Sequence, residues 1–357
     1  MSRSVRVLVV DDSALMRKLI PQILERDRSI QVVGTAMDGS FVSKKIEELR
    51  PDVITLDLEM PRMDGMDTLR EIMRTHRLPV IVVSAHSTQG ASTTFKALSM
   101  GAFDFVAKPR DAASAHMDGI SAELIAKIKA AAQTKLPAGH LPVIETARPR
   151  KPLVREMGAA SRIVAIGIST GGPHALQYVL AQLPGDFPGA IAVVQHMPEG
   201  FTEMFARRLN ECCAIEVKEA QSGDMLVAGR ALICPGNRHM KVRRMPLGDI
   251  VVLSDEDRVN GHRPSVEMLF RSLAQEYGPQ GIAVLMTGMG EDGAEGLGAV
   301  KSAGGVTIAQ SEESCVVFGM PKAAIDRGHA TRVVSLDAMA NTLQAQCVAE
   351  RTRAARV

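Results

Sequence analysis

The stretch IVAIGISTGG, which runs from Ile163 to Gly172, is an apolar run that ends in a serine flanked by glycines. Such a run before a glycine-rich turn is typical of a buried parallel strand that leads into a helix. Gly167 to Gly171 also fit Gly-x-Ser-x-Gly, a turn that exposes a serine hydroxyl beside the free amides of a helix start. The motif alone leaves Ser169 open as a nucleophile, part of a phosphate-binding loop or a structural turn.

A dinucleotide-binding site is disfavoured at this turn. It would require Gly-x-Gly-x-x-Gly and an acidic residue about 20 positions further along. Ser169 replaces the middle glycine, and the next strand ends in Gln195 and His196 instead of an acid.

Alternating strands and helices continue from this stretch toward the C-terminus. The predicted strands are RIVAIGIS, AIAVVQH, RALICPG, IVVLSD and GIAVLMTG, and helices are expected after Pro173, Gly200, Pro264 and Gly293. This alternation predicts a doubly wound, mainly parallel α/β domain over residues 159–357.

The same alternation appears toward the N-terminus. The runs VRVLVV, IQVVGTA, DVITLD, PVIVVSA and DFVAKP are each followed by a segment suited to a crossover helix. They predict a five-stranded parallel sheet wrapped by helices over residues 1–133.

A proline-rich segment separates the two predicted sheets. Residues 134–158 contain Pro137, Pro142, Pro149 and Pro152 and show neither a helical nor a strand period. We interpret this segment as a semi-extended linker. The length of 357 residues also favours two domains.

Composition excludes several classes of protein. A hydrophobic content of 46% and a net charge of +2 are ordinary for a globular protein and give no basic field for nucleic acid. No apolar run reaches the roughly 18 residues of a membrane span, and Val5–Val10 is too short for a signal peptide. We therefore expect a cytoplasmic protein without direct membrane insertion. The 5 cysteines lack paired Cys-x-x-Cys spacing, so reduced thiols are expected and neither a disulfide framework nor a zinc site is indicated.

Acidic and phosphate-binding side chains end the strands of the first predicted sheet. Asp11 and Asp12 follow the first strand, Asp57 ends the third, Ser84 the fourth, and Lys108 the fifth. Ligands of parallel sheets gather at this carboxyl edge. Converging carboxylates need neutralising, which a hard cation that prefers oxygen ligands, such as Mg²⁺, would do. Each acid alone could be a solvated strand cap, but matching positions at several strand ends favour a site.

This pattern resembles the receiver domain of bacterial response regulators, a flavodoxin-like fold, over about residues 4–133. The resemblance implies that Asp57 accepts a phosphoryl group and that Phe105 occupies the position of a switch aromatic. It further implies that Mg²⁺ is bound by Asp11, Asp12, Asp57 and the backbone of Glu59, and that Ser84 and Lys108 contact the phosphoryl group.

A nucleophilic serine needs a base within hydrogen-bond reach and an acid that orients the base. The candidate bases are His174, His196, His239, His262 and His329. His196 ends the strand next in sequence, so a parallel sheet places it at the same edge as Ser169, and His239 is the main competitor. For the acid, Asp292 lies in a glycine-rich turn after a strand, whereas Asp255 lies in the polar run SDEDR. The order Ser169, His196, Asp292 differs from the Ser, Asp, His order of α/β-hydrolases.

The segments GISTGGPHAL, VVQHMP, CPGNRHM, HRPSVEMLF and TGMGEDG resemble the CheB family of chemotaxis protein-glutamate methylesterases. The resemblance implies hydrolysis of glutamate methyl esters on chemoreceptor signalling helices, with deamidation of receptor glutamines and control by the histidine kinase of the chemotaxis system. It implies a triad of Ser169, His196 and Asp292, an oxyanion contact from the Met289 amide, and no cofactor for the ester hydrolysis. Glu267 stands where family members often have Asp, which leaves a substrate contact there open.

Two alternatives remain beside this interpretation. One is a two-component response regulator with a binding output, usually to DNA, which the near-neutral α/β sequence after the linker disfavours. The other is a phosphorylation-regulated hydrolase that acts on a different ester, and the sequence does not exclude it.

Overall fold

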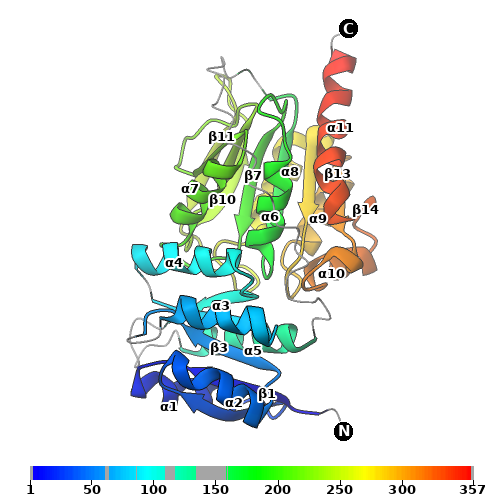
Figure 1. The fold of residues 1–357 in the computed structure, drawn as a ribbon. Coiled ribbons are helices and arrows are strands. Elements are labelled where there is room, and N and C mark those ends of the chain that lie inside the picture. Colours follow the sequence, from blue (N-terminus) through cyan, green and yellow to red (C-terminus); the bar gives the residue numbers. More distant parts are fainter. Residues whose placement is uncertain are drawn as a thin grey trace. The chain divides into compact units, whose positions relative to one another are not determined.

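The computed structural model describes residues 3–60, 64–85, 87–108, 117–133, 158 and 160–354. The chain forms two compact units, Met1–Val143 and Ile144–Val357, each with its own sheet and core (Figure 1). The predicted linker, residues 134–158, lies outside the described residues except for Gly158.

The first unit contains a five-stranded sheet in the order β2-β1-β3-β4-β5, in which every neighbouring pair is parallel. Its strands are β1 (Val5–Val10), β2 (Ile30–Ala36), β3 (Val53–Asp57), β4 (Val80–Ser84) and β5 (Asp104–Ala107). Its helices are α1 (Ala14–Leu24), α2 (Val42–Leu49), α3 (Gly65–Thr75), α4 (Thr88–Ser99) and α5 (Met117–Gln133). The prediction of five parallel strands is confirmed. Strand order reverses between β1 and β3, the place where parallel sheets form a ligand crevice.

The second unit is built on a seven-stranded parallel sheet in the order β14-β13-β12-β6-β7-β9-β8. The strands are β6 (Ile163–Ile168), β7 (Ala190–Gln195), β8 (Glu216–Glu219), β9 (Arg230–Ile233), β12 (Gly281–Leu285), β13 (Val306–Gln310) and β14 (Arg332–Val334). The helices are α6 (Gly172–Ala181), α7 (Thr202–Cys212), α8 (Val266–Tyr277), α9 (Ala294–Ser302), α10 (Met320–Asp326) and α11 (Leu336–Ala354). The predicted fold class is confirmed.

One predicted strand lies outside this main sheet. IVVLSD forms β11 (Ile250–Ser254), which pairs antiparallel with β10 (His239–Arg243) in a separate two-stranded sheet. Only Val251 of β11 is fully buried, so the apolar run reflects a half-buried hairpin strand. Four strands were not predicted from the sequence: β8, β10, β13 and β14. β8 (EVKE) and β10 (HMKVR) carry charged side chains, and β14 has only 3 residues.

Close packing of α8 against β6 places the start of this helix beside the serine turn. A Cβ atom at Gly167 would lie 2.1 Å from Val266 Cγ1, so only glycine permits this approach. Val266 is the first residue of α8 and is fully buried in the core of the unit. Gly167 is therefore required by the close packing of β6 against α8 as well as by the turn motif.

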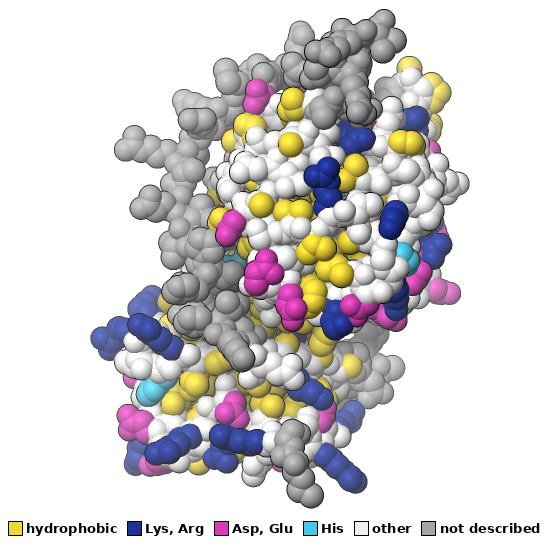
Figure 2. Space-filling model, turned by 90° about the vertical axis from the view of Figure 1, so that its right-hand side faces the viewer, with side chains coloured by type: hydrophobic (Ala, Val, Ile, Leu, Met, Phe, Trp, Pro, Cys, Tyr) yellow, Lys and Arg dark blue, Asp and Glu magenta, His cyan; other side chains and the backbone are white. Residues whose placement is uncertain are grey.

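None of the described helices has the length and apolar character that a membrane crossing requires. On the face drawn in Figure 2, the described Lys and Arg side chains are interspersed with Asp and Glu and do not gather into an extended basic area.

Candidate active site

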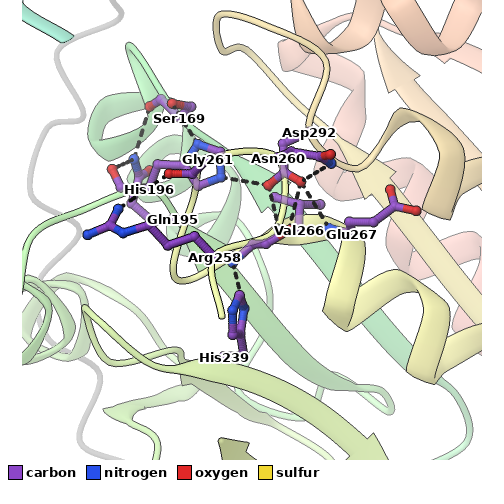
Figure 3. Close-up of polar contacts among 11 residues, drawn as sticks. Ser169, Gln195, His196, His239, Arg258, Asn260, Gly261, Val266, Glu267 and Asp292 are labelled. Carbon is purple, nitrogen blue, oxygen red and sulfur yellow. Dashed lines mark hydrogen bonds and ion pairs between the residues drawn. The ribbon is translucent and has the colours of Figure 1, made fainter. Parts of the chain in front are cut away.

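Ser169, His196 and Asp292 lie at one edge of the second sheet. Ser169 follows β6 and His196 follows β7, while Asp292 lies in the turn between β12 and α9. Strands β12, β6 and β7 are adjacent, so the segments that follow them meet where the strand order reverses. Figure 3 shows the three side chains pointing toward one another.

The three side chains form a continuous hydrogen-bonded chain. His196 Nδ1 lies 3.2 Å from Ser169 Oγ, and His196 Nε2 lies 2.8 Å from Asp292 Oδ2. The side chains of His196 and Asp292 are 9% and 1% exposed, so their contact is shielded from water. An acid, an imidazole and a hydroxyl in this order can activate the serine oxygen as a nucleophile.

The turn that carries Ser169 is held from both sides. Gly172 N donates to Ser169 O at 2.8 Å, and Ser169 N donates to Thr287 O at 3.0 Å. A Cβ atom at Gly288 would lie 2.7 Å from Ser169 Cβ, so the glycine lets the loop after β12 pack directly on the serine. The side-chain amide of Gln195 donates to Ser169 O and to His196 O, at 3.0 and 3.1 Å, which joins the serine turn to the end of β7.

The carboxylate of Asp292 sits at the start of α8 and accepts several hydrogen bonds. Its Oδ2 accepts from Val266 N at 2.7 Å, and its Oδ1 accepts from Ser265 Oγ at 2.7 Å and Asn260 Nδ2 at 3.0 Å. Burial raises the pKa of Asp292, but the hydrogen bond and charge of His196 and the bonds from Ser265 and Asn260 outweigh burial and lower the pKa to about 2. Asp292 is therefore ionised at neutral pH and can only accept, so Nε2 of His196 carries a proton and Nδ1 presents its lone pair to Ser169.

The contacts of three other candidate histidines show that their rings are engaged elsewhere than at the serine hydroxyl. His239 is fully buried, with Nε2 3.0 Å from Asp257 O and Nδ1 accepting from Ser265 N at 3.3 Å. His329 Nδ1 lies 2.9 Å from Ala294 O. His262 stacks on His196 with ring centroids 3.9 Å apart. Of these imidazoles, His196 is the one that the structure places at the serine hydroxyl.

Two backbone amides lie close to the serine. Met289 follows Gly288, whose backbone packs against Ser169, and Thr170 directly follows the serine. In the part of the chain that the structure describes, neither the Met289 N–H nor the Thr170 N–H donates a hydrogen bond. Both amides are therefore candidate donors to an oxygen that develops negative charge beside Ser169. Thr170 was missed in the sequence interpretation, although the residue after the nucleophile often has this role in Gly-x-Ser-x-Gly turns.

A second polar cluster lies at the carboxyl edge of the first sheet. Lys108 Nζ lies 2.6 Å from Asp57 Oδ2 and 3.2 Å from Asp11 Oδ2. Glu59 N donates to Asp57 Oδ1 at 3.1 Å. Carboxylate oxygens of Asp11, Asp12 and Asp57 all lie within 4.8 Å of one another. The structure thus brings together the acids and the lysine that the strand ends suggested.

Burial sets the protonation behaviour of this cluster. Burial raises the pKa of both Asp11 and Asp57, and the nearby Lys108 ammonium offsets this rise only in part. Burial alone would lower the pKa of Lys108, but the carboxylates of Asp57 and Asp11 raise it instead. Asp11 Oδ2 is buried without a directed hydrogen bond, although it is within ion-pair distance of Lys108. An oxygen-only donor set with an unsatisfied buried carboxylate oxygen suits a hard divalent cation.

Ser84 and Phe105 take inward positions. Ser84 Oγ accepts from Thr94 Oγ1 at 2.6 Å and donates to Gly90 O at 3.3 Å, so its hydroxyl is directed at α4. Phe105 is 3% exposed and packs edge-on against Phe95. A hydrogen bond from Ser84 to a phosphoryl group on Asp57 would require the hydroxyl proton to turn away from Gly90 O, while Ser84 Oγ can still accept from Thr94.

Comparison with known proteins decides the family. A model of the CheB methylesterase family matches residues 164–343, and a model of the response regulator receiver domain matches residues 7–117. A protein-glutamate methylesterase/protein-glutamine glutaminase 2 of Koribacter versatilis is 63% identical over 353 residues, which cover 97% of each chain. The chain belongs to the CheB methylesterase family. A protein-glutamate methylesterase/protein-glutamine glutaminase of Syntrophotalea carbinolica is 46% identical over 344 residues, 95% of this chain and 97% of its own.

A solved structure supports the family assignment for the second unit. The CheB methylesterase catalytic domain of Thermotoga maritima superposes with a TM-score of 0.50 and 41% sequence identity, covering 51% of this chain and 97% of that domain. The N-terminal receiver domain and the C-terminal CheB domain are therefore both present in this chain.

The residue that departs from the common CheB pattern has a structural role. Glu267 is 5% exposed, and its carboxylate accepts from Gly296 N at 2.8 Å and Arg271 Nε at 2.6 Å. The bond from Gly296 ties α8 to the start of α9, and the bond from Arg271 lies within α8. The carboxylate is directed into the protein, so the structure gives no support to a substrate contact at this position.

Several residues that contact Ser169, His196 or Asp292 were not identified from the sequence of this CheB-family chain. Asn260 and Ser265 donate hydrogen bonds to Asp292, and Gln195 joins the serine turn to the backbone of His196. Asn260 and Ser265 belong to a loop before α8, whose path no apolar period predicts. Gln195 offered a weak signal, because a polar residue that ends a buried strand needs partners.

Proposed function

We propose that this chain is a phosphorylation-regulated serine hydrolase that demethylates glutamate methyl esters on chemoreceptor signalling helices and deamidates receptor glutamines. The observation that carries the proposal is the hydrogen-bonded order Ser169, His196, Asp292 at the edge of the CheB-family sheet. This role would place the chain in the cytoplasm with the histidine kinase and the receptor signalling helices as partners.

In the acylation step, His196 acts as the base. Nδ1 of His196 takes the hydroxyl proton of Ser169 while Oγ bonds to the side-chain carbonyl carbon of the methylated glutamate. The carbonyl oxygen becomes an anion, and in this proposal the amides of Met289 and Thr170 stabilise it. His196 then returns the proton to the methoxy oxygen, the carbon–oxygen bond to that group breaks, and methanol leaves an acyl-enzyme on Ser169.

In the deacylation step, water replaces the serine. His196 removes a proton from water as the water oxygen bonds to the acyl carbon, and the same proton returns to Ser169 Oγ as the acyl bond breaks. The products are free enzyme and a glutamate side chain. A glutamine substrate passes through the same acyl-enzyme and releases ammonia in place of methanol. Asp292 holds the base in the required tautomer and stabilises the imidazolium that forms in each step.

Control of this activity is assigned to the receiver domain. Asp57 accepts the phosphoryl group, and Asp11, Asp12, Asp57 and the backbone carbonyl of Glu59 would hold Mg²⁺, which offsets the charge of the incoming phosphoryl group. Lys108, already paired with Asp57, remains in reach of a phosphoryl oxygen. Ser84 donates its hydroxyl to the same group once the proton turns away from Gly90 O.

Methanol release from methylated chemoreceptor membranes tests this function. The full chain should release methanol, and Mg²⁺ with beryllofluoride, a phosphoryl mimic, should change that rate in the wild type but not in Asp57→Asn. A rate of methanol release equal to that of membranes without protein would overturn the esterase assignment. A rate that responds to beryllofluoride equally in wild type and Asp57→Asn would overturn the assignment of the control site. A small methyl ester hydrolysed faster than the receptors would favour the alternative substrate class.

A further inference from the structure

The turn formed by residues 259–262 touches two members of the triad. Val259 N donates to His262 O at 3.1 Å, and His262 N donates to Val259 O at 2.9 Å, so the turn is closed by two backbone bonds. We propose that this turn is a positioning element for the proposed hydrolytic reaction. In this proposal, which rests on the proposed function, His262 sets the ring plane of His196 and Asn260 sets the carboxylate of Asp292.

His262 restrains the base through its ring face. The imidazoles of His262 and His196 have centroids 3.9 Å apart and an interplanar angle of 7°. A base that bonds a serine on one side and a carboxylate on the other must keep its ring in one plane, because rotation breaks both bonds. The parallel ring of His262 opposes that rotation without using either nitrogen of His196. Such aromatic pairs add stabilisation beyond buried area.

Asn260 restrains the acid from the same turn. Its side-chain amide donates to Asp292 Oδ1 at 3.0 Å, while His196 binds the other carboxylate oxygen (Figure 3). Asn260 has a φ of 53°, in the left-handed region that asparagine tolerates better than most residues. The backbone conformation and the side-chain contact thus both suit asparagine at this position.

The turn itself is anchored to the body of the unit. Arg263 Nη1 donates to Asp255 O at 2.9 Å, and Arg263 Nη2 donates to Asn237 Oδ1 at 2.9 Å. The buried His239 bonds Asp257 O at 3.0 Å. A positioning group is effective only when its own support is rigid. These contacts supply that support and give His239 a place in the same assembly.

Matched variants of His262 in the full chain test the stacking contact. His262→Phe keeps a flat ring, whereas His262→Leu keeps apolar volume without one. We expect kcat for methanol release to fall about 3- to 10-fold in His262→Leu with KM unchanged, and to stay within about 2-fold of wild type in His262→Phe. Asn260→Ala should lower kcat about 10-fold, because Asp292 loses one of its donors. His329→Leu, which removes another half-buried imidazole of the unit, should leave kcat within about 2-fold.

Two further readouts keep this test separate from the function and from folding. Thermal unfolding of each variant identifies a protein that is merely destabilised, and the ¹⁵N and ring-proton shifts of His196 report stacking without any turnover. In wild type and His262→Phe the His196 ring protons should show a ring-current shift that His262→Leu lacks. Equal kcat in His262→Leu and His262→Phe, or ring shifts that do not differ, would overturn the inference. Wild-type turnover by folded Ser169→Ala would instead overturn the proposed function.

Discussion

Replacing Asp292 with asparagine should remove the charge of the acid while keeping the tautomer of the base. In the wild type, Asp292 Oδ2 accepts from His196 Nε2 and from Val266 N. Its Oδ1 accepts from Ser265 Oγ and Asn260 Nδ2 and, at the longer distance of 3.4 Å, from Glu267 N. Two of these donors are fixed backbone N–H groups, and Val266 N at 2.7 Å is much closer than Glu267 N at 3.4 Å, so an NH₂ group is disfavoured more strongly on the side of Val266. Ser265 can rotate its hydroxyl, and Asn260 can turn its amide, so that both become acceptors.

The amide oxygen of the variant is therefore expected to stay on the side of His196. Nε2 of His196 keeps its proton, and Nδ1 still faces Ser169. What is lost is the attraction between a carboxylate and the imidazolium, at most about 4 kcal/mol for unit charges about 4 Å apart at an effective dielectric constant of about 20. This corresponds to a loss in kcat of about 10²- to 10³-fold. In a serine protease in which the corresponding Asp→Asn substitution reverses the tautomer of the catalytic histidine, kcat falls about 10⁴-fold.

The assay is methanol release from methylated chemoreceptors, combined with ¹⁵N NMR of the His196 ring nitrogens. We expect Asp292→Asn to retain measurable turnover well above Ser169→Ala and to keep the proton on Nε2. A loss of about 10⁴-fold or more, together with a proton on Nδ1, would refute this reasoning about the orientation of the amide. Asp255→Asn, an exposed acid of the same loop region, serves as the control and should match the wild type.

The remaining predictions concern phosphorylation, pH and the packing of α8. Asp57→Asn should incorporate no phosphoryl group from acetyl phosphate and Mg²⁺, whereas Asp67→Asn on α3 should label as the wild type does; label in Asp57→Asn would exclude that acceptor. The lowered pKa of Asp292, about 2 against 3.8, contributes about 2 kcal/mol of stability above pH ~4 that is lost as the pH falls toward 2. Denaturant unfolding should show this loss in wild type but not in Asp292→Asn, and equal pH dependence would contradict it. Glu267→Ala should lower the free energy of unfolding by about 1–3 kcal/mol with kcat nearly unchanged. The control Glu295→Ala, at an exposed position, should change neither the free energy of unfolding nor kcat. A selective loss of kcat in Glu267→Ala would indicate a substrate contact.

The parallel sheets were predictable because their strands are buried on both faces and read as continuous apolar runs. β1, β3, β6 and β12 all show this pattern, and each is followed by a helix start. Short strands gave no such signal: β8 has the sequence EVKE, and β14 has only 3 residues. The antiparallel pairing of β11 was missed, since an apolar run does not say which sheet it joins.

The sequence predicted those site residues that directly follow parallel strands. Ser169 and His196 end neighbouring parallel strands, so their approach follows from topology alone. The contacts of Asn260, His262 and Ser265 depend on the path of the loop before α8, and the loop sequence has no helical or strand periodicity from which that path could be predicted. Glu267 could not be assigned inward or outward, because its partner Gly296 lies on another helix. The boundaries 1–133, 134–158 and 159–357, and the oxyanion role of Met289, stay predictions.

The central claim, that Ser169 is the nucleophile of a receptor methylesterase, is tested most directly by Ser169→Ala. The substitution deletes the attacking oxygen and keeps a small side chain that fits the turn. With folding verified by thermal unfolding, the initial rate of methanol release from methylated chemoreceptor membranes should drop to the rate without protein. Adding His196→Ala to this variant should lower the rate no further, because the triad acts as a unit. A folded Ser169→Ala protein that still releases methanol at near the wild-type rate would contradict the account.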